Sequence, residues 1–118
     1  MDDKIREEKF EMLDEGLEYM CRVLSQIDKT CANLRKKEGI DAIAQISEGF
    51  MATMQIVKYT ADLTQIKIDD ENIKGFVAEM VEGMENGDFN LVADIIEYEF
   101  KPLYDEWAEA FDRVVNND

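Results

Sequence analysis

The chain has 118 residues and no histidine, and this absence removes most of the familiar catalytic and metal sites. Without an imidazole there is no Ser-His or Cys-His nucleophile pair and no Glu-x-x-His element of a di-iron bundle. Zinc sites normally combine Cys and His ligands, and only Cys21 and Cys31 are present. We therefore expect no catalytic residue, no metal site and no cofactor, and we predict that the protein is not an enzyme.

Cysteines are few and long apolar runs are missing. Cys21 and Cys31 lie on one predicted helix, about 15 Å apart at ~1.5 Å per residue, and a disulfide needs Cα atoms within about 7 Å. No apolar run approaches the roughly 18 residues that span a bilayer. The first ten residues, MDDKIREEKF, are charged where a secretory signal has an apolar stretch. We expect a cytoplasmic protein with reduced thiols and no membrane partner.

Basic residues are scarce, with 13 Lys and Arg against 28 Asp and Glu, so the net charge is −15. Residues 41–118 hold 18 of the acidic residues and 5 of the basic ones, a net charge of −13. A nucleic-acid-binding protein is expected to carry a basic face, so we predict no nucleic-acid partner. The acidic excess suits a basic protein surface, although such an excess also simply keeps proteins soluble.

There is one proline and no useful stretch of strand-like alternation, and what remains is a ladder of apolar residues at steps of three and four. This spacing places all rungs on one helix face, which must be buried. In the first third the rungs are Phe10, Leu13, Leu17, Met20, Leu24, Ile27, Cys31 and Leu34. In the second they are Ile43, Phe50, Met54, Val57 and Ala61, with Ser47 at the one missing rung, and in the last Ile96, Phe100, Leu103, Trp107, Ala110 and Val114.

We predict a single all-α domain over residues 1–118, an antiparallel four-helix bundle with short turns. Each long helix carries a second apolar stripe beside the ladder, which favours a bundle over a two-stranded coiled coil. The predicted helices cover about residues 3–37, 41–66, 70–86 and 88–115.

Helix ends are marked by residues with known capping preferences. Asp41, Asp69 and Asp88 are predicted N-caps, and Gly39 and Gly87 are predicted turn positions after a helix. Pro102 lies inside the last helix but leaves the ladder in phase. Its ring removes a backbone donor, so we expect a continuous helix with a kink at residues 98–102.

An echo of the form apolar-x-x-apolar-x-Glu-Gly-apolar occurs at residues 10–17, 43–50 and 77–84. Glycine inside a helix lowers helix stability by about 1 kcal/mol relative to alanine, so the glycine of each copy needs an explanation. Close helix packing, an old duplication and chance in a Glu-rich chain all remain open. In a hairpin that turns near residue 39, Gly16 would face Ala61.

Carboxylates at helical spacing are plentiful and most often form a solvated face. They could also hold a divalent cation or do acid–base work. Glu99 is the one carboxylate on a ladder line. A twelve-residue window from Asn86 resembles a calcium loop, but Leu91 stands where that loop needs glycine, so we do not predict calcium binding.

Six of the eleven aromatic residues lie between Phe89 and Phe111. Those on or beside the ladder are predicted core. A separate line of apolar residues runs along another face of the last predicted helix. Two interpretations remain open: a neighbouring helix covers this line, or the line is an exposed contact surface for a homodimer or a partner helix. This candidate interaction surface consists of Leu91, Ile95, Tyr98 and Pro102.

The segment DIIEYEFKPLYDEW, residues 94–107, resembles the C-terminal end of short helical proteins from bacteria of the Firmicutes type, a group with no established activity. The resemblance implies an intracellular bacterial helical protein.

Three functions follow as hypotheses. The first is a non-enzymatic helical interaction module, an adaptor or chaperone-like protein, whose partner is another protein or a second copy. The second is an acidic regulator or decoy that occupies a basic protein surface. The third is a helical protein that binds a metal through carboxylates.

Overall fold

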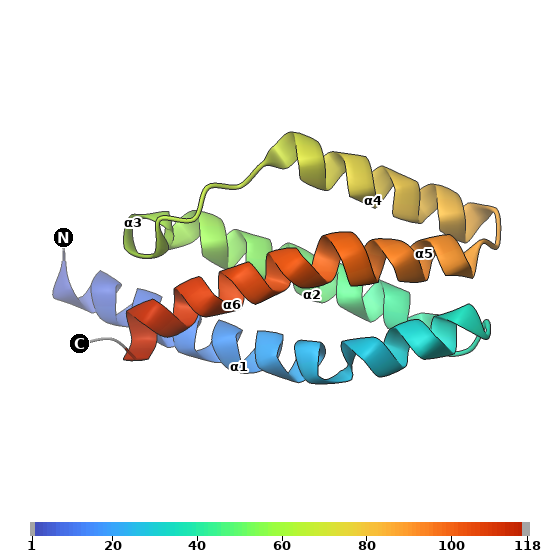
Figure 1. Cartoon of the computed structure of the whole chain (residues 1–118). Coiled ribbons are helices and arrows are strands. Elements are labelled where there is room, and N and C mark those ends of the chain that lie inside the picture. Colours follow the sequence, from blue (N-terminus) through green and yellow to red (C-terminus); the bar gives the residue numbers. More distant parts are fainter. Residues whose placement is uncertain (1, 117–118) are drawn as a thin grey trace.

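The computed structural model describes residues 2–116, and all regular structure within this range is helical (Figure 1). The elements are α1 (Asp3–Arg35), α2 (Asp41–Tyr59), α3 (Ala61–Thr64), α4 (Asp70–Glu85), α5 (Phe89–Ile95), the π-helical η1 (Ile96–Phe100) and α6 (Lys101–Asn116). The all-α prediction is therefore confirmed for the part of the chain that the structure describes.

Aspartates begin most of the long helices. The Asp69 carboxylate accepts a hydrogen bond from the Asn72 amide at 3.1 Å, and that of Asp88 accepts one from the Leu91 amide at 3.1 Å. Both predicted caps are confirmed, because an acidic side chain satisfies a free amide there. The prediction for Asp41 was wrong: Ile40 precedes α2 without a side-chain hydrogen bond, and Asp41 is its first helical residue.

Two predicted helix ends lie too far along the chain. The first helix ends at Arg35 because Lys37 already adopts a positive φ of 62°, ahead of Gly39 at 65°. The predicted helix 41–66 is interrupted at Thr60, whose hydroxyl donates to the Ile56 carbonyl at 2.6 Å. α2 ends next to this residue, and only the single turn of α3 follows.

The region around Pro102 is a continuous helix with one wider turn. The π-helical residues Ile96–Phe100 directly precede α6, and the Lys101 amide donates to the carbonyl of Ile96, five residues back. Pro102 has no amide to give and its ring crowds the turn before it, so a wider turn accommodates it. The departure from α geometry thus begins two residues before the predicted 98–102.

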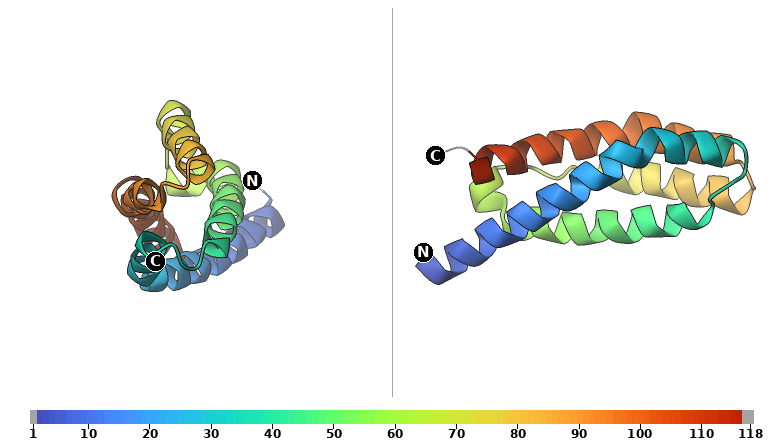
Figure 2. Two further views of the ribbon diagram at one scale, coloured as in Figure 1. Left: turned by 90° about the vertical axis from the view of Figure 1, so that its right-hand side faces the viewer. Right: turned by 90° about the horizontal axis from the view of Figure 1, so that it is seen from below.

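Successive long segments run in alternating directions along one axis (Figure 1). α1 lies against α2 and along the whole α5–η1–α6 helix, which is its principal neighbour. After the Gly87 turn the chain folds back, so that α5 packs against α4. α5 is the principal neighbour of α4. The end view in Figure 2 shows α4 standing away from α1, with α5–α6 and α2 on either side.

The core is centred on aromatic rings from three helices. Phe50 stacks on Trp107 with centroids 5.3 Å apart and meets Phe100 edge-on at 5.3 Å. Tyr104 packs against Phe100 at 4.6 Å and is fully buried, although it lies off the predicted ladder. The ladder residues with at most 4% exposure are Leu13, Met20, Ile27, Cys31, Leu34, Ile43, Phe50, Val57, Ile96, Phe100, Trp107 and Ala110.

The glycines of the Glu-Gly echo each lie under a neighbouring side chain. A Cβ on Gly16 would approach Phe111 Cε2 to 2.9 Å, so the prediction that Gly16 faces Ala61 was wrong. Gly49 lies beneath the Tyr19 hydroxyl, and a Cβ on Gly83 would come within 3.0 Å of Val92 Cγ2. Close packing accounts for all three positions.

Candidate functional site

The surface predicted from Leu91, Ile95, Tyr98 and Pro102 is not one continuous patch. Ile95 is 4% exposed, and Leu91 is half-buried next to Gly83 of α4. Tyr98, at 69%, and Pro102 are exposed. The structure therefore separates the line into a covered part and an exposed part. The reason is that α5 is the principal neighbour of α4, and Tyr98 and Pro102 lie beyond α5.

An apolar opening lies instead between α2 and α4. It forms a shallow groove with a cavity volume of about 90 Å³. We call it the α2/α4 groove. Phe50, Phe76 and Phe100 are buried at its floor, and Met51, Val77, Val81 and Met84 are exposed along its sides. Its lining is apolar except for one residue and consists of Ile46, Ser47, Phe50, Met51, Phe76, Val77, Met80, Val81, Met84 and Phe100.

The sequence of α4 explains why the groove stays open. Its apolar residues follow steps of three and one, and these steps make two adjacent stripes. The stripe of Ile73, Phe76 and Met80 is at most 7% exposed. The second stripe, Val77, Val81 and Met84, has no helix over it and is 39–48% exposed.

On the α2 side, Ser47 stands at the missing rung of the ladder and lines the groove. A small side chain there leaves space that a Leu or Met would fill. Sequence reasoning overlooked this site, although both signals were visible: the double stripe of α4 and the interrupted ladder of α2.

One end of the groove is bounded by a weak ion pair. Lys58 Nζ, in the last turn of α2, lies 3.9 Å from Asp70 Oδ1 at the start of α4. Both side chains are more than half exposed, and pairs of this kind contribute between nothing and about 1 kcal/mol. The two sides are therefore not held rigidly together at this end.

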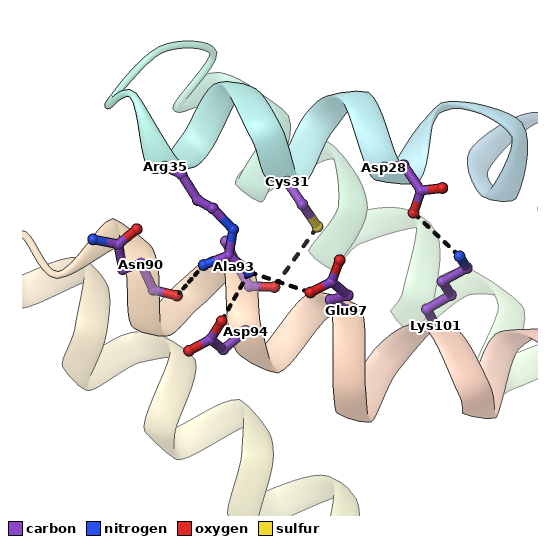
Figure 3. A network of polar contacts seen from close by, with 8 residues as sticks. All are labelled: Asp28, Cys31, Arg35, Asn90, Ala93, Asp94, Glu97 and Lys101. Carbon is purple, nitrogen blue, oxygen red and sulfur yellow. Dashed lines mark hydrogen bonds and ion pairs between the residues drawn. The ribbon is translucent and has the colours of Figure 1, made fainter.

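The opposite side of the molecule is closed by polar contacts between α1 and the α5–η1–α6 helix (Figure 3). Arg35 donates to Asp94 at 2.8 Å and to Glu97 at 3.3 Å, and Lys101 donates to Asp28 at 3.1 Å. Neighbouring carboxylates raise the pKa of both Arg35 and Lys101 by hydrogen bonding to their charged forms. These pairs are partly exposed and lie beside the buried contacts between the two helices.

Cys31 lies inside this closed side. Its thiol points to the Ala93 carbonyl at 3.7 Å (Figure 3), and burial raises its pKa to about 11. A thiol of such high pKa is not a nucleophile at neutral pH, so its predicted role as a core side chain agrees with its 3% exposure. Cys21 is exposed.

A buried hydroxyl pair joins α2 to α6. The Thr53 and Tyr104 oxygens lie 2.7 Å apart, and Thr53 donates to the Gly49 carbonyl at 2.8 Å. Burial raises the pKa of Tyr104 to about 12, so its phenol is neutral at physiological pH. The pair has its hydrogen-bonding partners within the protein and is a packing element.

Carboxylates do not gather into a ligand set within residues 2–116, where no three His, Cys, Asp or Glu side chains are close enough to hold a metal ion. Glu99, the carboxylate on the ladder line, is exposed. Across the described residues no helix has the length and apolar character needed to span a membrane.

The chain belongs to the family described as Domain of unknown function (DUF8042), which it matches over residues 8–110. No curated protein and no solved structure matches it. The matched range includes the whole α2/α4 groove, so this opening lies within the family domain.

Proposed function

We propose that this DUF8042 protein is a non-enzymatic interaction module that holds an amphipathic helix of another protein in the α2/α4 groove. In this proposal the four long segments form an antiparallel four-helix bundle that is open along one side. A helix from the partner then occupies the place where a further helix would pack.

The observation that carries the proposal is where the exposed apolar side chains gather. The described residues include eight large hydrophobics with exposed side chains, and four of them line this one groove: Met51, Val77, Val81 and Met84. A contiguous apolar surface exposed in this way is typical of a binding site, whereas scattered apolar residues are ordinary.

The lining suits a helical occupant. Aromatic rings at the floor, Phe50, Phe76 and Phe100, can receive large side chains that recur at steps of three and four on one helix face. Met51, Met80 and Met84 add unbranched side chains that adjust to the shape of the bound residue. The groove is therefore adaptable in detail but specific for an apolar stripe.

Several side chains that could act as catalysts support a function without enzymatic activity, because they are either missing or protonated. Histidine is missing, and the buried Cys31 and Tyr104 keep their protons because burial raises the pKa of each. The free thiols of Cys21 and Cys31 favour the cytoplasm as the compartment, and the resemblance of residues 94–107 favours a bacterial one.

The test uses a displayed library of 18-residue amphipathic helices with a common leucine stripe and with Lys, Glu or Gln at the remaining positions. We expect the wild-type chain to enrich a subset of clones, and Val77→Asp/Val81→Asp to enrich none. Both valines are exposed, so circular dichroism and urea unfolding should show a folded variant.

Tyr98→Asp is the matched control, because it also places a charge at an exposed apolar position but outside the groove. It should bind the selected peptides like wild type. If Tyr98→Asp abolishes binding while Val77→Asp/Val81→Asp retains it, the contact surface is the exposed part of the Tyr98–Pro102 line and the groove proposal is wrong.

The second candidate is an acidic regulator that occupies a basic protein surface, and the net charge of −15 supports it. Charge contacts on an exposed surface are screened at 0.5 M salt, whereas apolar burial is not. Peptide binding that disappears at 0.5 M NaCl in wild type, and is unaffected by Val77→Asp/Val81→Asp, would favour this candidate. A second copy of the chain is a less suitable occupant, because two chains of this charge repel each other.

A further inference from the structure

The two ends of the α2/α4 groove differ in charge. At the end formed by residues 41–51 of α2 and 78–85 of α4, the charged side chains are Asp41, Glu48, Glu79, Glu82 and Glu85, with no basic residue. At the end formed by residues 52–59 and 70–77, two acidic residues, Asp70 and Glu71, are balanced by Lys58 and Lys74.

The carboxylates of the acidic end are not engaged in direct ion pairs within the described chain, residues 2–116. All five carboxylates there are exposed. Two of them are at helical spacing from an exposed groove residue and so share its helix face: Glu48 lies three residues before Met51, and Glu85 lies four residues after Val81. Their charge therefore lies beside the apolar lining.

We infer that the partner helix is basic at one end and neutral at the other, and that its Lys or Arg residues lie against Glu48 and Glu85. The inference rests on the proposed function, because it specifies the occupant of the same groove. An apolar stripe supplies affinity along the whole groove, and the one-sided charge fixes which end of the helix lies where. A helix that is acidic at that end is rejected by repulsion.

The experiment selects the displayed helix library against the full chain at 0.15 M NaCl and reads the sequences. Enriched clones should concentrate Lys in one half of the helix. A selected peptide should bind Glu48→Gln/Glu85→Gln about fivefold more weakly than wild type, the effect of losing two exposed charge pairs. The loss should shrink at 0.5 M NaCl.

Glu7→Gln/Glu8→Gln is the matched control, because it removes the same net charge from exposed positions near the start of α1. It should bind the peptide nearly as well as wild type. If the two double charge variants bind equally, or if the enriched clones show no one-sided Lys, the inferred charge polarity of the partner is wrong while the groove remains. If Val77→Asp/Val81→Asp enriches as well as wild type, the proposed function itself fails.

A nitroxide on the Lys-rich end of the peptide gives a second readout. It should broaden the amide NMR signals of Glu48 and Glu85 and leave those of Lys58 and Lys74 sharp. Broadening near Lys58 and Lys74 instead would overturn the inferred orientation, whatever the affinity.

Discussion

The side of the molecule between α1 and the α5–η1–α6 helix and the side between α2 and α4 are built from helices of similar character, yet one is closed and the other is open. On the closed side, fully buried residues such as Leu13, Ile27 and Phe111 pack together. Arg35 and Lys101 pair with carboxylates across it at about 3 Å. On the open side, the ion pair of Lys58 and Asp70 is 3.9 Å long, and Met51 is 60% exposed.

The difference shows that an apolar stripe on a helix does not by itself say what covers it. Each stripe on α1 meets a neighbour, because α1 runs along both α2 and the last helix. α4 carries two stripes but has one principal neighbour, α5. The stripe that remains is available for another molecule, and it is the basis of the proposed function.

The largest expected contrast comes from shortening one side chain in the central core and one on the open side. Trp107, 1% exposed, stacks on Phe50, so Trp107→Ala should lower the free energy of unfolding by about 3–5 kcal/mol. Met51 is largely in solvent, so Met51→Ala should change that free energy by less than about 0.5 kcal/mol. Urea unfolding measures both. Similar losses for the two variants would mean that the α2/α4 side is closed in solution.

Two glycines, one facing the closed side and one in α4, give a smaller expected difference in stability. Gly16→Ala pushes a methyl group toward Phe111, which is fully buried, whereas Gly75 in α4 has no neighbouring atom within 4 Å of an added Cβ. Gly75→Ala should therefore stabilise the protein by up to about 1 kcal/mol through helix propensity. Gly16→Ala should be less stable than Gly75→Ala by about 1–3 kcal/mol, the cost of overpacking. Thermal unfolding of the pair checks the difference, and equal stability of the two variants would contradict the close approach of Phe111.

The smallest effect at neutral pH concerns Tyr104, which is buried between α2 and α6. Its pKa is raised to about 12 in the folded protein because burial disfavours the phenolate. A pKa above the ordinary value of 10 favours folding below pH 10, and that contribution is lost as the pH rises from 10 through 12. The ultraviolet titration of wild type minus that of Tyr104→Phe should show one phenolate forming near pH 12, and the alkaline fall in stability should be shallower in the variant. A component that titrates near pH 10 would show that Tyr104 is accessible to water.

Much of the fold could be predicted because its signals are local. Asp69 and Asp88 satisfy amides within three residues of themselves, and the ladder residues Ile27 and Trp107 follow a period set by the helix alone. Thr60 was harder, because a threonine hydroxyl either points to solvent or bonds back to its helix, and the spacing of apolar residues does not distinguish these cases.

The site was less predictable. Ile95 and Tyr98 belong to one apolar line, yet one is buried and the other exposed, because Ile95 lies in α5, the principal neighbour of α4, and Tyr98 lies beyond α5. Tyr104 lies off the ladder but is fully buried, since its hydroxyl meets Thr53 inside the protein. Both outcomes depend on contacts between residues that are up to about fifty positions apart in the sequence. These residues come together only in the folded chain.

The sequence by itself determined the helical class, most helix starts and the residues of the central core, because helix periodicity and capping act over a few neighbouring residues. Tertiary structure alone decided which of two stripes on α4 is covered and where the uncovered one faces, since this depends on how the Gly87 turn places α4 against α5. The α2/α4 groove, and with it the proposed binding of a helix, arises from that placement.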